Sequence, residues 1–170
     1  MTVDPAPKRN VADQHADCVR IGFSGTRKGM TPQQRETVEE LLDGERVDEV
    51  HHGDCVGADA NFHDMCCGRY PIVIHPPSEV KLRAFCKDAE VRPSKGYLAR
   101  NRDIVDETDE LIATPRAGSE EWQTGGTWYT VNYARQRGKP VTVVYADGSA
   151  QGWVSVDMSQ RQSDGSLRNG

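Results

Sequence analysis

Short apolar runs alternate with amphipathic segments along the chain, and this alternation limits the folds that the chain can adopt. Five runs predict buried strands, at 18–25, 47–53, 71–77, 109–115 and 139–147. Helical patterns separate them at 31–44, 57–68, 97–108 and 126–138. Strands that are joined through helices pair in parallel. The sequence therefore predicts an α/β, Rossmann-like doubly wound domain with a mostly parallel sheet of five or more strands and helices on both faces.

The helix at 31–44 carries the clearest end signals. Thr31 is suited to be the N-cap, Pro32 to be the first helical residue, and Gln34 to complete a capping box, while Gly44 marks the end. This helix should therefore begin and end at these residues.

Length and composition restrict the classes of protein. A chain of 170 residues with a net charge of −5 suits one domain and not a basic nucleic-acid coat protein. No apolar run approaches the ~20 residues that span a bilayer, and residues 1–10 lack the apolar core of a signal peptide. The five cysteines, with Cys66 next to Cys67, favour reduced thiols over a disulfide framework. We expect a cytoplasmic protein without membrane contact.

The two ends of the chain differ from its middle. Residues 1–17 are polar and without periodicity, so they are expected to form a mobile leader. The ordered domain should span 18–147, followed by a polar tail at 148–170 in which WVSV (153–156) could add a short edge strand.

Unusual residues follow each predicted strand, where parallel sheets bind their ligands. In HGDCVGAD, Gly53 and Gly57 can bring the backbone close to a phosphate at a helix N-terminus, with Asp54 and Asp59 beside it. The same glycines can equally make a tight turn without a ligand. The pattern leaves both readings open.

Two further loops have a similar character. Gly125, Gly126 and Thr127 open a helix and offer backbone donors and a hydroxyl to a phosphate. The loop after the first strand adds hydroxyls and cations at the same edge, from Ser24, Gly25, Thr26, Arg27 and Lys28. Trp128 is expected in the core or at its rim.

The segment RNRDIV places Arg100, Asn101 and Arg102 before the strand at 109–115. Residues two apart cannot share a helix face, so one arginine should point to the ligand while the other packs or pairs with a carboxylate such as Asp106. The alternative is a solvated, charged helix.

A metal site is the less favoured interpretation of the histidines and cysteines. The candidates are His51, His52, Cys55, His63, Cys66 and Cys67. His51 and His52 are strand neighbours that point to opposite faces, and the chain has no C-x-x-C motif. We expect neither a metal nor another cofactor, Cys66 and Cys67 as buried hydrophobes, and His63 as a packing residue. A nucleophilic Cys55 with a lowered pKa at a helix N-terminus is a minor alternative.

The motifs, in their order, resemble the SLOG superfamily. The resemblance rests on GFSGTR, HGDCVGAD, RNRDIV before DELIA, and GGTW before YAR and GKPV, over residues 18–145. That superfamily includes the DNA-processing protein DprA, the Lonely Guy phosphoribohydrolases and small standalone nucleotide-binding proteins of the kind found in bacteria and phages.

This resemblance implies a nucleotide or nucleotide-derived ligand, such as a cyclic nucleotide or an ADP-ribose-like signal. Its phosphates would lie on the 53–57 and 125–127 turns, with Arg27, Arg100 and Arg102 as counter-charges. Asp54 or Asp59 would accept a hydrogen bond from a sugar or a base. A sensor or sequestering protein is the first expectation, without enzymatic activity.

Two other functions follow from the resemblance. Lonely Guy enzymes cleave nucleoside monophosphates, and Arg100 matches their catalytic arginine, but Thr130 stands where they carry a glutamate. Asp54, Asp59, Glu120 or Glu121 would then have to supply the carboxylate. DprA implies single-stranded DNA as the partner, which the acidic net charge disfavours. The helices at 97–108 and 128–137 are the candidate faces of a homodimer.

Overall fold

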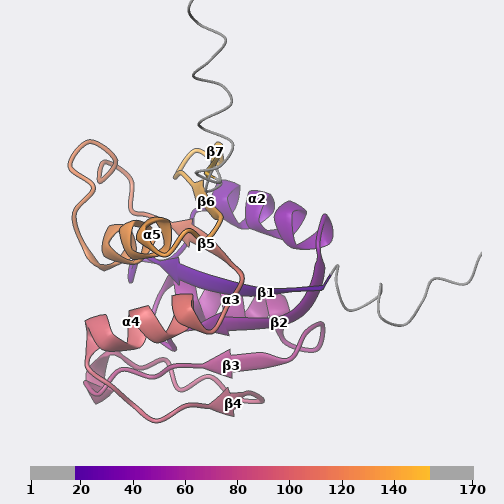
Figure 1. Ribbon diagram of the computed structural model, residues 1–170, viewed down its shortest axis with the longest axis vertical. Helices are drawn as coiled ribbons and strands as arrows, with labels where there is room; N and C mark the ends of the chain where they lie inside the picture. The colour runs from indigo at the N-terminus through magenta and orange to yellow at the C-terminus, as the bar shows by residue number, and fades with distance from the viewer. Residues whose placement is uncertain (1–17, 154–170) are drawn as a thin grey trace, which may run out of the picture.

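A single seven-stranded sheet forms the centre of the protein. The computed structural model describes residues 18–153. The strands are β1 (Cys18–Gly25), β2 (Arg46–His52), β3 (Ile72–Ile74), β4 (Glu90–Val91), β5 (Glu110–Thr114), β6 (Val141–Val144) and β7 (Ala150–Trp153). Their order is β4-β3-β2-β1-β5-β6-β7, and every pair is parallel except β6 with β7 (Figure 1). The predicted fold class is confirmed.

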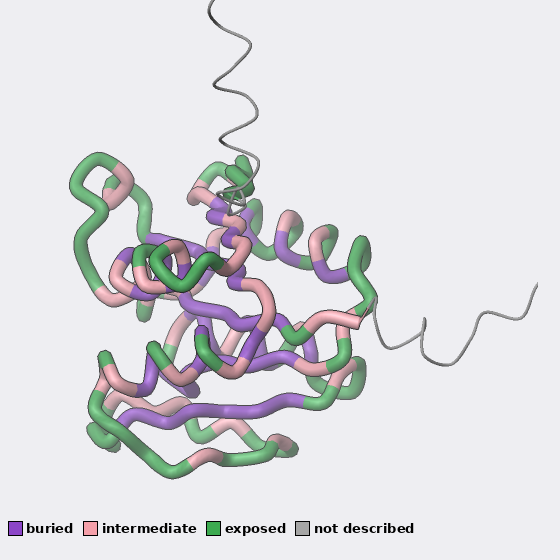
Figure 2. Tube along the Cα trace, in the orientation of Figure 1, coloured by how far each residue is buried: buried purple, intermediate pink, exposed green. Residues whose placement is uncertain are grey.

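Helices cover both faces of the sheet. The elements are α2 (Pro32–Asp43), α3 (Ala58–Cys66), the short 3₁₀ helix η1 (Val80–Leu82), α4 (Tyr97–Asp106) and α5 (Gly126–Gln136). Val38 of α2 and Phe62 of α3 pack on one face in a core cluster that includes Phe23. Val105 of α4 and Val131 of α5 pack in a second cluster on the other face. Buried residues run along the central strands, while the outer sides of the helices are exposed (Figure 2).

The direction of chain growth reverses between two central strands. From β1 the chain adds β2, β3 and β4 on one side, and then returns to add β5, β6 and β7 on the other. β1 and β5 are hydrogen-bonded neighbours up to the pair Gly25 and Thr114. In an open parallel sheet, the loops that leave such a pair diverge at the carboxyl ends and leave a crevice there.

The edges of the sheet depart from the sequence prediction. The third strand is limited to Ile72–Ile74, and Pro76 and Pro77 follow it closely. β4 was not predicted, because its two residues are both exposed and show no apolar pattern. The edge strand expected at 153–156 is observed at Ala150–Trp153, while 154–156 and the leader 1–17 lie outside the described residues. Within the described chain, no helix has the length and apolar character needed to cross a membrane.

The ends of α2 follow the predicted signals. Thr31 Oγ1 accepts a hydrogen bond from the Gln34 amide at 3.1 Å, and Gln34 Oε1 accepts one from the Thr31 amide at 2.9 Å. The Gln34 side chain is buried, and its Nε2 also donates to the carbonyls of Pro115 (3.1 Å) and Val144 (3.0 Å). A single amide thus caps α2 and fixes it to the ends of β5 and β6.

We expect Gln34→Leu to lower the free energy of unfolding by about 2 to 4 kcal/mol, because two buried carbonyls lose their donor and the Thr31 amide loses its acceptor in the capping box. Gln33→Leu makes the same chemical change at an exposed neighbour and should change stability by less than about 0.5 kcal/mol. Urea unfolding of both variants measures the difference. Equal effects would contradict the role given to Gln34.

Candidate functional site

A large cavity lies at the carboxyl ends of β1 and β5. Its volume is about 510 Å³, within the range of small-molecule sites. It is bounded by the loop after β1, by the start of α4, by the loop 115–125 and by the start of α5. The lining residues are Gly25, Thr26, Arg27, Lys28, Tyr97, Pro115, Arg116, Gly118, Ser119, Trp122, Thr124, Gly125, Gly126, Thr127 and Trp128.

The charged side chains in this lining are all positive. Arg27, Lys28 and Arg116 contribute cations, and no carboxylate is among the lining residues. Glu120 and Glu121, although close in sequence, are not part of the lining. The cavity therefore favours an anionic ligand over a neutral or cationic one.

The N-terminus of α5 adds hydrogen-bond donors to the cavity. Gly125 is the N-cap, with a φ of 101° that favours glycine. The amides of Gly126, Thr127 and Trp128 have no acceptor among the described residues. A Cβ on Gly126 would overlap the hydroxyl of Tyr97, so this position requires glycine for packing. The free amides and the helix dipole together suit an anion.

Two tryptophans of this region have different surroundings. Trp122 is 73% exposed on the loop 115–125, which projects beside α5 in Figure 1. Trp128 is buried, and its Nε1 donates to Ser119 Oγ at 3.0 Å, which ties the loop to α5. Trp128 is packed, as the sequence predicted. Trp122 was not predicted to border a cavity, because the residues around it in the sequence carry no signal of one.

Backbone amides of the turn at 53–57 donate hydrogen bonds to acceptors within the protein. The Cys55 amide donates to Asp59 Oδ2 (3.1 Å) and the Val56 amide to the Leu82 carbonyl (3.0 Å). The Ala58 amide donates to the carbonyl of Thr26 (2.9 Å). Gly57 has a φ of 98°, and a Cβ there would overlap the backbone of Arg27. The glycine thus lets the loop after β1 cross the start of α3.

Arg100 lies beneath the large cavity and is only 3% exposed. Its Nη1 donates to the carbonyls of Gly53 and His75, the latter at 3.0 Å, and its Nη2 contacts Cys55 Sγ at 3.4 Å. Its guanidinium carbon lies 5.0 Å from the centroid of the Tyr97 ring. The Nε atom is buried without a partner in the described structure. Of the two arginines in RNRDIV, Arg100 is therefore the one that points inward.

A second, very small cavity of about 10 Å³ adjoins Arg100. Gly25, Arg27 and Tyr97 line both this cavity and the large one. The predicted site residues that line it are Ser24, Gly25, Arg27, Gly53, Asp59, Arg100 and Asn101. Around the large cavity the predicted residues are Gly25, Thr26, Arg27, Lys28, Gly125, Gly126 and Thr127, whereas Gly57 lines neither cavity.

Burial shifts the pKa of two groups in the small cavity. The pKa of Asp59 is raised to about 6 by desolvation, against which the charge of Arg100 acts in the opposite direction. The pKa of the Cys55 thiol is also raised, again chiefly by burial. The hypothesis of a Cys55 nucleophile with a lowered pKa is therefore wrong, since the thiol is desolvated more strongly than the nearby Arg100 stabilises its charge.

Asp54 and Arg102 line neither cavity. Asp54 is fully buried, with its carboxylate accepting from Arg83 Nε and from the Cys86 amide, both at 2.8 Å. Arg102 is exposed and donates to the Tyr129 hydroxyl at 3.2 Å. The expected pairing of an RNR arginine with Asp106 is wrong, because the Asp106 carboxylate contacts Arg137 Nε at 3.2 Å instead.

His51 and His52 point to opposite faces of β2, as the sequence predicted. His52 Nδ1 accepts from the Asp54 amide (3.0 Å), and its Nε2 lies 2.9 Å from His63 Nδ1. His63 Nε2 lies 2.7 Å from the carbonyl of Lys87. Because a carbonyl only accepts, His63 donates from Nε2 and accepts at Nδ1, so each ring is neutral and fully hydrogen-bonded.

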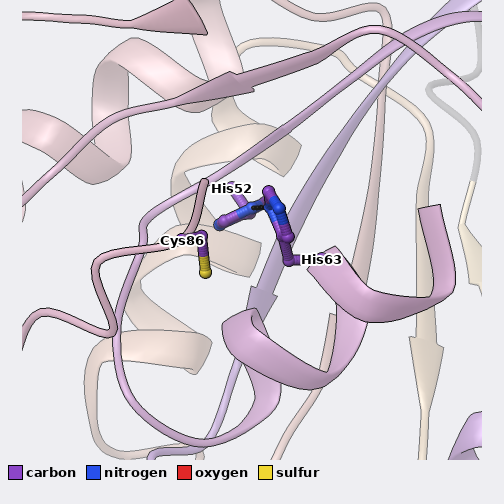
Figure 3. A group of neighbouring side chains, drawn as sticks. All are labelled: His52, His63 and Cys86. Atoms are coloured by element: carbon purple, nitrogen blue, oxygen red, sulfur yellow. Dashed lines mark hydrogen bonds between the residues drawn. The ribbon is translucent and has the colours of Figure 1, made fainter. Parts of the chain in front are cut away.

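Figure 3 shows His52 and His63 together with Cys86, three side chains of a kind that can hold a metal ion. Both histidine rings have their lone pairs occupied by the hydrogen bonds above. Burial and the nearby Asp54 raise the pKa of the Cys86 thiol to about 12, so that it stays protonated. Because the Asp54 amide donates to His52 Nδ1, the proton of that ring stays on Nε2, beside His63, and cannot move to the other ring nitrogen.

Comparison with known proteins gives the fold. No protein-family model matches the sequence, and no curated protein matches it. A molybdenum cofactor binding protein from the phototrophic bacterium Rippkaea orientalis superposes with a TM-score of 0.56 at 20% identity, over 88% of this chain and 84% of that one. The DNA processing protein A of Helicobacter pylori, solved for its single-stranded DNA binding mode, gives 0.50 at 18% identity, over 86% and 73%. The chain has a Rossmann-type fold like those of these two proteins.

We expect Gly53→Ala to lower the free energy of unfolding by about 1 to 3 kcal/mol, since its Cβ would overlap the guanidinium of Arg100. Gly96→Ala, with a φ of −53° and open space around its Cβ, is the matched control and should have little effect. Chemical denaturation of the two variants checks this. If both variants were as stable as the wild type, Arg100 would not be fixed by Gly53.

The raised pKa of Asp59 gives a pH-dependent prediction. A carboxyl group whose pKa is higher in the folded state favours folding when protonated, and this contribution is lost as the pH rises through about 6. The stability of Asp59→Asn relative to the wild type should therefore increase by about 2 kcal/mol between pH 4 and pH 7. Urea unfolding at both pH values measures it, and Asp64→Asn, an exposed carboxylate of α3, controls for the loss of one charge. A constant difference would contradict the prediction.

Proposed function

We propose that this protein binds a nucleotide or a nucleotide-derived anion in the large cavity at the ends of β1 and β5. The observation that carries the proposal is the combination of three cations, a helix N-terminus with three available amides and no carboxylate in one lining. Phosphate groups are recognised by this combination of positive charge and oriented backbone donors.

The position of each part of the ligand follows from the lining. The phosphates lie at Gly125–Thr127, close to Arg27, Lys28 and Arg116. The exposed indole of Trp122 offers a flat apolar surface on which a base can stack. Of the two turns predicted to hold the phosphates, 125–127 is retained and 53–57 is not, since the amides of Cys55 and Val56 donate within the protein.

One of the two similar proteins is a molybdenum cofactor binding protein, and the other binds single-stranded DNA. For this chain, a cavity of about 510 Å³ suits a small molecule, whereas a strand of DNA needs an extended basic groove. The net charge of −5 also opposes a polyanion. A small-molecule sensor or sequestering protein is thus the favoured function.

Cleavage of the bound nucleotide is the second candidate, and Asp59 is the observation in its favour. Its carboxyl group lies in the small cavity that adjoins the large one, and its pKa of about 6 suits a proton donor near neutral pH. Arg100 then positions the backbone around Asp59 and does not contact the phosphate. Thr130 is buried and donates to the Gly126 carbonyl at 2.9 Å, so it takes part in the helix alone.

The decisive experiment is thermal-shift titration with mononucleotides, cyclic dinucleotides, NAD and ADP-ribose, followed by product analysis of each hit. A ligand that raises the melting temperature and is recovered intact supports binding alone, because binding to the native state stabilises it. Release of free base that is lost in Asp59→Asn supports cleavage instead. No stabilisation by any phosphate-bearing compound would overturn the proposal.

Side-chain replacement tests where the ligand lies. We expect Lys28→Gln and Arg116→Gln each to weaken binding about tenfold through the loss of a charge-assisted hydrogen bond, and Trp122→Ala to weaken it by about fivefold or more. Arg102→Gln removes an exposed arginine outside the cavity and should leave the affinity within about twofold. Calorimetric titration of the four variants gives the comparison. Loss of binding in Arg102→Gln alone would place the ligand elsewhere.

A further inference from the structure

A second group of potential metal ligands lies on the face of β2 opposite to His52. It consists of His51 at the end of β2, His75 directly after β3, and Glu107 at the carboxyl end of α4. His51 Nδ1 and His75 Nε2 are 2.9 Å apart, and Glu107 Oε2 lies 3.7 Å from the first and 3.6 Å from the second. Three elements that are distant in sequence thus place three donor atoms together.

The spacing of these atoms suits a small transition-metal ion. Three points with these separations lie on a circle of radius about 2.0 Å, which matches the 2.0–2.2 Å of zinc bonds to histidine nitrogen and carboxylate oxygen. An ion at this centre reaches all three atoms with shifts of tenths of an ångström. Two histidines and one carboxylate also form a common ligand set that leaves further positions open to water.

The hydrogen bonds around His51 prepare its ring for a metal. Glu49 Oε1 lies 2.7 Å from His51 Nε2, and a carboxylate only accepts, so the ring carries its proton on Nε2. The lone pair on Nδ1 therefore faces His75 and Glu107. A ligating histidine whose second nitrogen donates to a carboxylate is the usual arrangement in metal sites.

The hydrogen bond between the two rings defines where His75 carries its proton. His51 Nδ1 has no proton and lies 2.9 Å from His75 Nε2, so His75 Nε2 is the donor. In the metal-free protein its Nε2 proton is directed at His51 Nδ1. Coordination at Nε2 needs only the transfer of that proton to Nδ1 of the same ring, with no net loss of a proton.

Solvent reaches this group through Glu107. Both histidines are buried, whereas the Glu107 side chain is 37% exposed. Arg92 Nε contacts Glu107 Oε2 at 3.1 Å and supplies the counter-charge in the metal-free protein. An incoming cation must compete with Arg92, and removal of this arginine should strengthen metal binding.

We propose that His51 Nδ1, His75 Nε2 and the Glu107 carboxylate bind a divalent transition-metal ion such as Zn²⁺, with water completing the coordination and Glu49 orienting His51. The group formed by His52, His63 and Cys86 is the contrasting case, since the Asp54 amide donates to His52 Nδ1 and thereby keeps the proton of that ring on Nε2. The site is separate from the cavity, although the carbonyl of His75 accepts from Arg100 below it.

Equilibrium dialysis of the full chain against Zn²⁺ tests the proposal. We expect one equivalent to bind, and His75→Gln and Glu107→Gln each to weaken binding at least tenfold. Glu107→Gln changes a partly exposed side chain, which guards against a loss of folding in the buried His75 variant. Arg92→Gln should bind Zn²⁺ more tightly than the wild type, and Cys86→Ala should bind it equally well.

The absorption spectrum with Co²⁺ separates this site from one that uses a cysteine. Visible bands without a thiolate-to-metal transition, lost in Glu107→Gln and retained in Cys86→Ala, support ligands of nitrogen and oxygen. A thiolate transition that disappears in Cys86→Ala would assign the metal to the other group and overturn the proposal. So would the absence of stoichiometric binding of either ion.

Discussion

The arrangement of the loops at the carboxyl ends of the strands depends on the hydrogen bonds of the buried Arg100 guanidinium. A cation removed from water requires acceptors, and Arg100 finds them in the carbonyls of Gly53 and His75, at the ends of β2 and β3. Asp59 adds a nearby carboxylate that acts on it electrostatically. One side chain from α4 thereby links the ends of two strands to the first turn of α3.

The consequences of this buried charge extend to the cavity. The ring of Tyr97 lies against Arg100 on one side and 5.9 Å from the Arg27 guanidinium on the other. The hydroxyl of Tyr97 reaches α5 so closely that only glycine fits at Gly126. Since Gly126 opens α5, the position of the available amides is set by packing that begins at Arg100. The geometry of the cavity thus depends on how the buried Arg100 guanidinium is hydrogen-bonded.

The two histidines of β2 show how neighbouring residues of a strand can serve different systems. His52 faces α3 and belongs to a closed chain of hydrogen bonds that ends at the carbonyl of Lys87. His51 faces α4 and meets His75 and Glu107, while its other ring nitrogen donates to Glu49. The alternation of strand side chains separates the two systems, and the partners on each face decide whether a lone pair is available.

The sequence by itself determined the fold class, the order of most elements and the ends of α2, because apolar periodicity and capping act over a few residues. It also predicted that a ligand binds at the strand ends and named seven of the residues that line the cavity there. Only the tertiary structure decided that Arg100 and Asp54 are buried among internal partners, that Trp122 borders the cavity, and that His75 and Glu107 join His51. These outcomes depend on contacts between residues that are far apart in the chain. A local sequence pattern does not show which groups hydrogen-bond to a buried polar side chain.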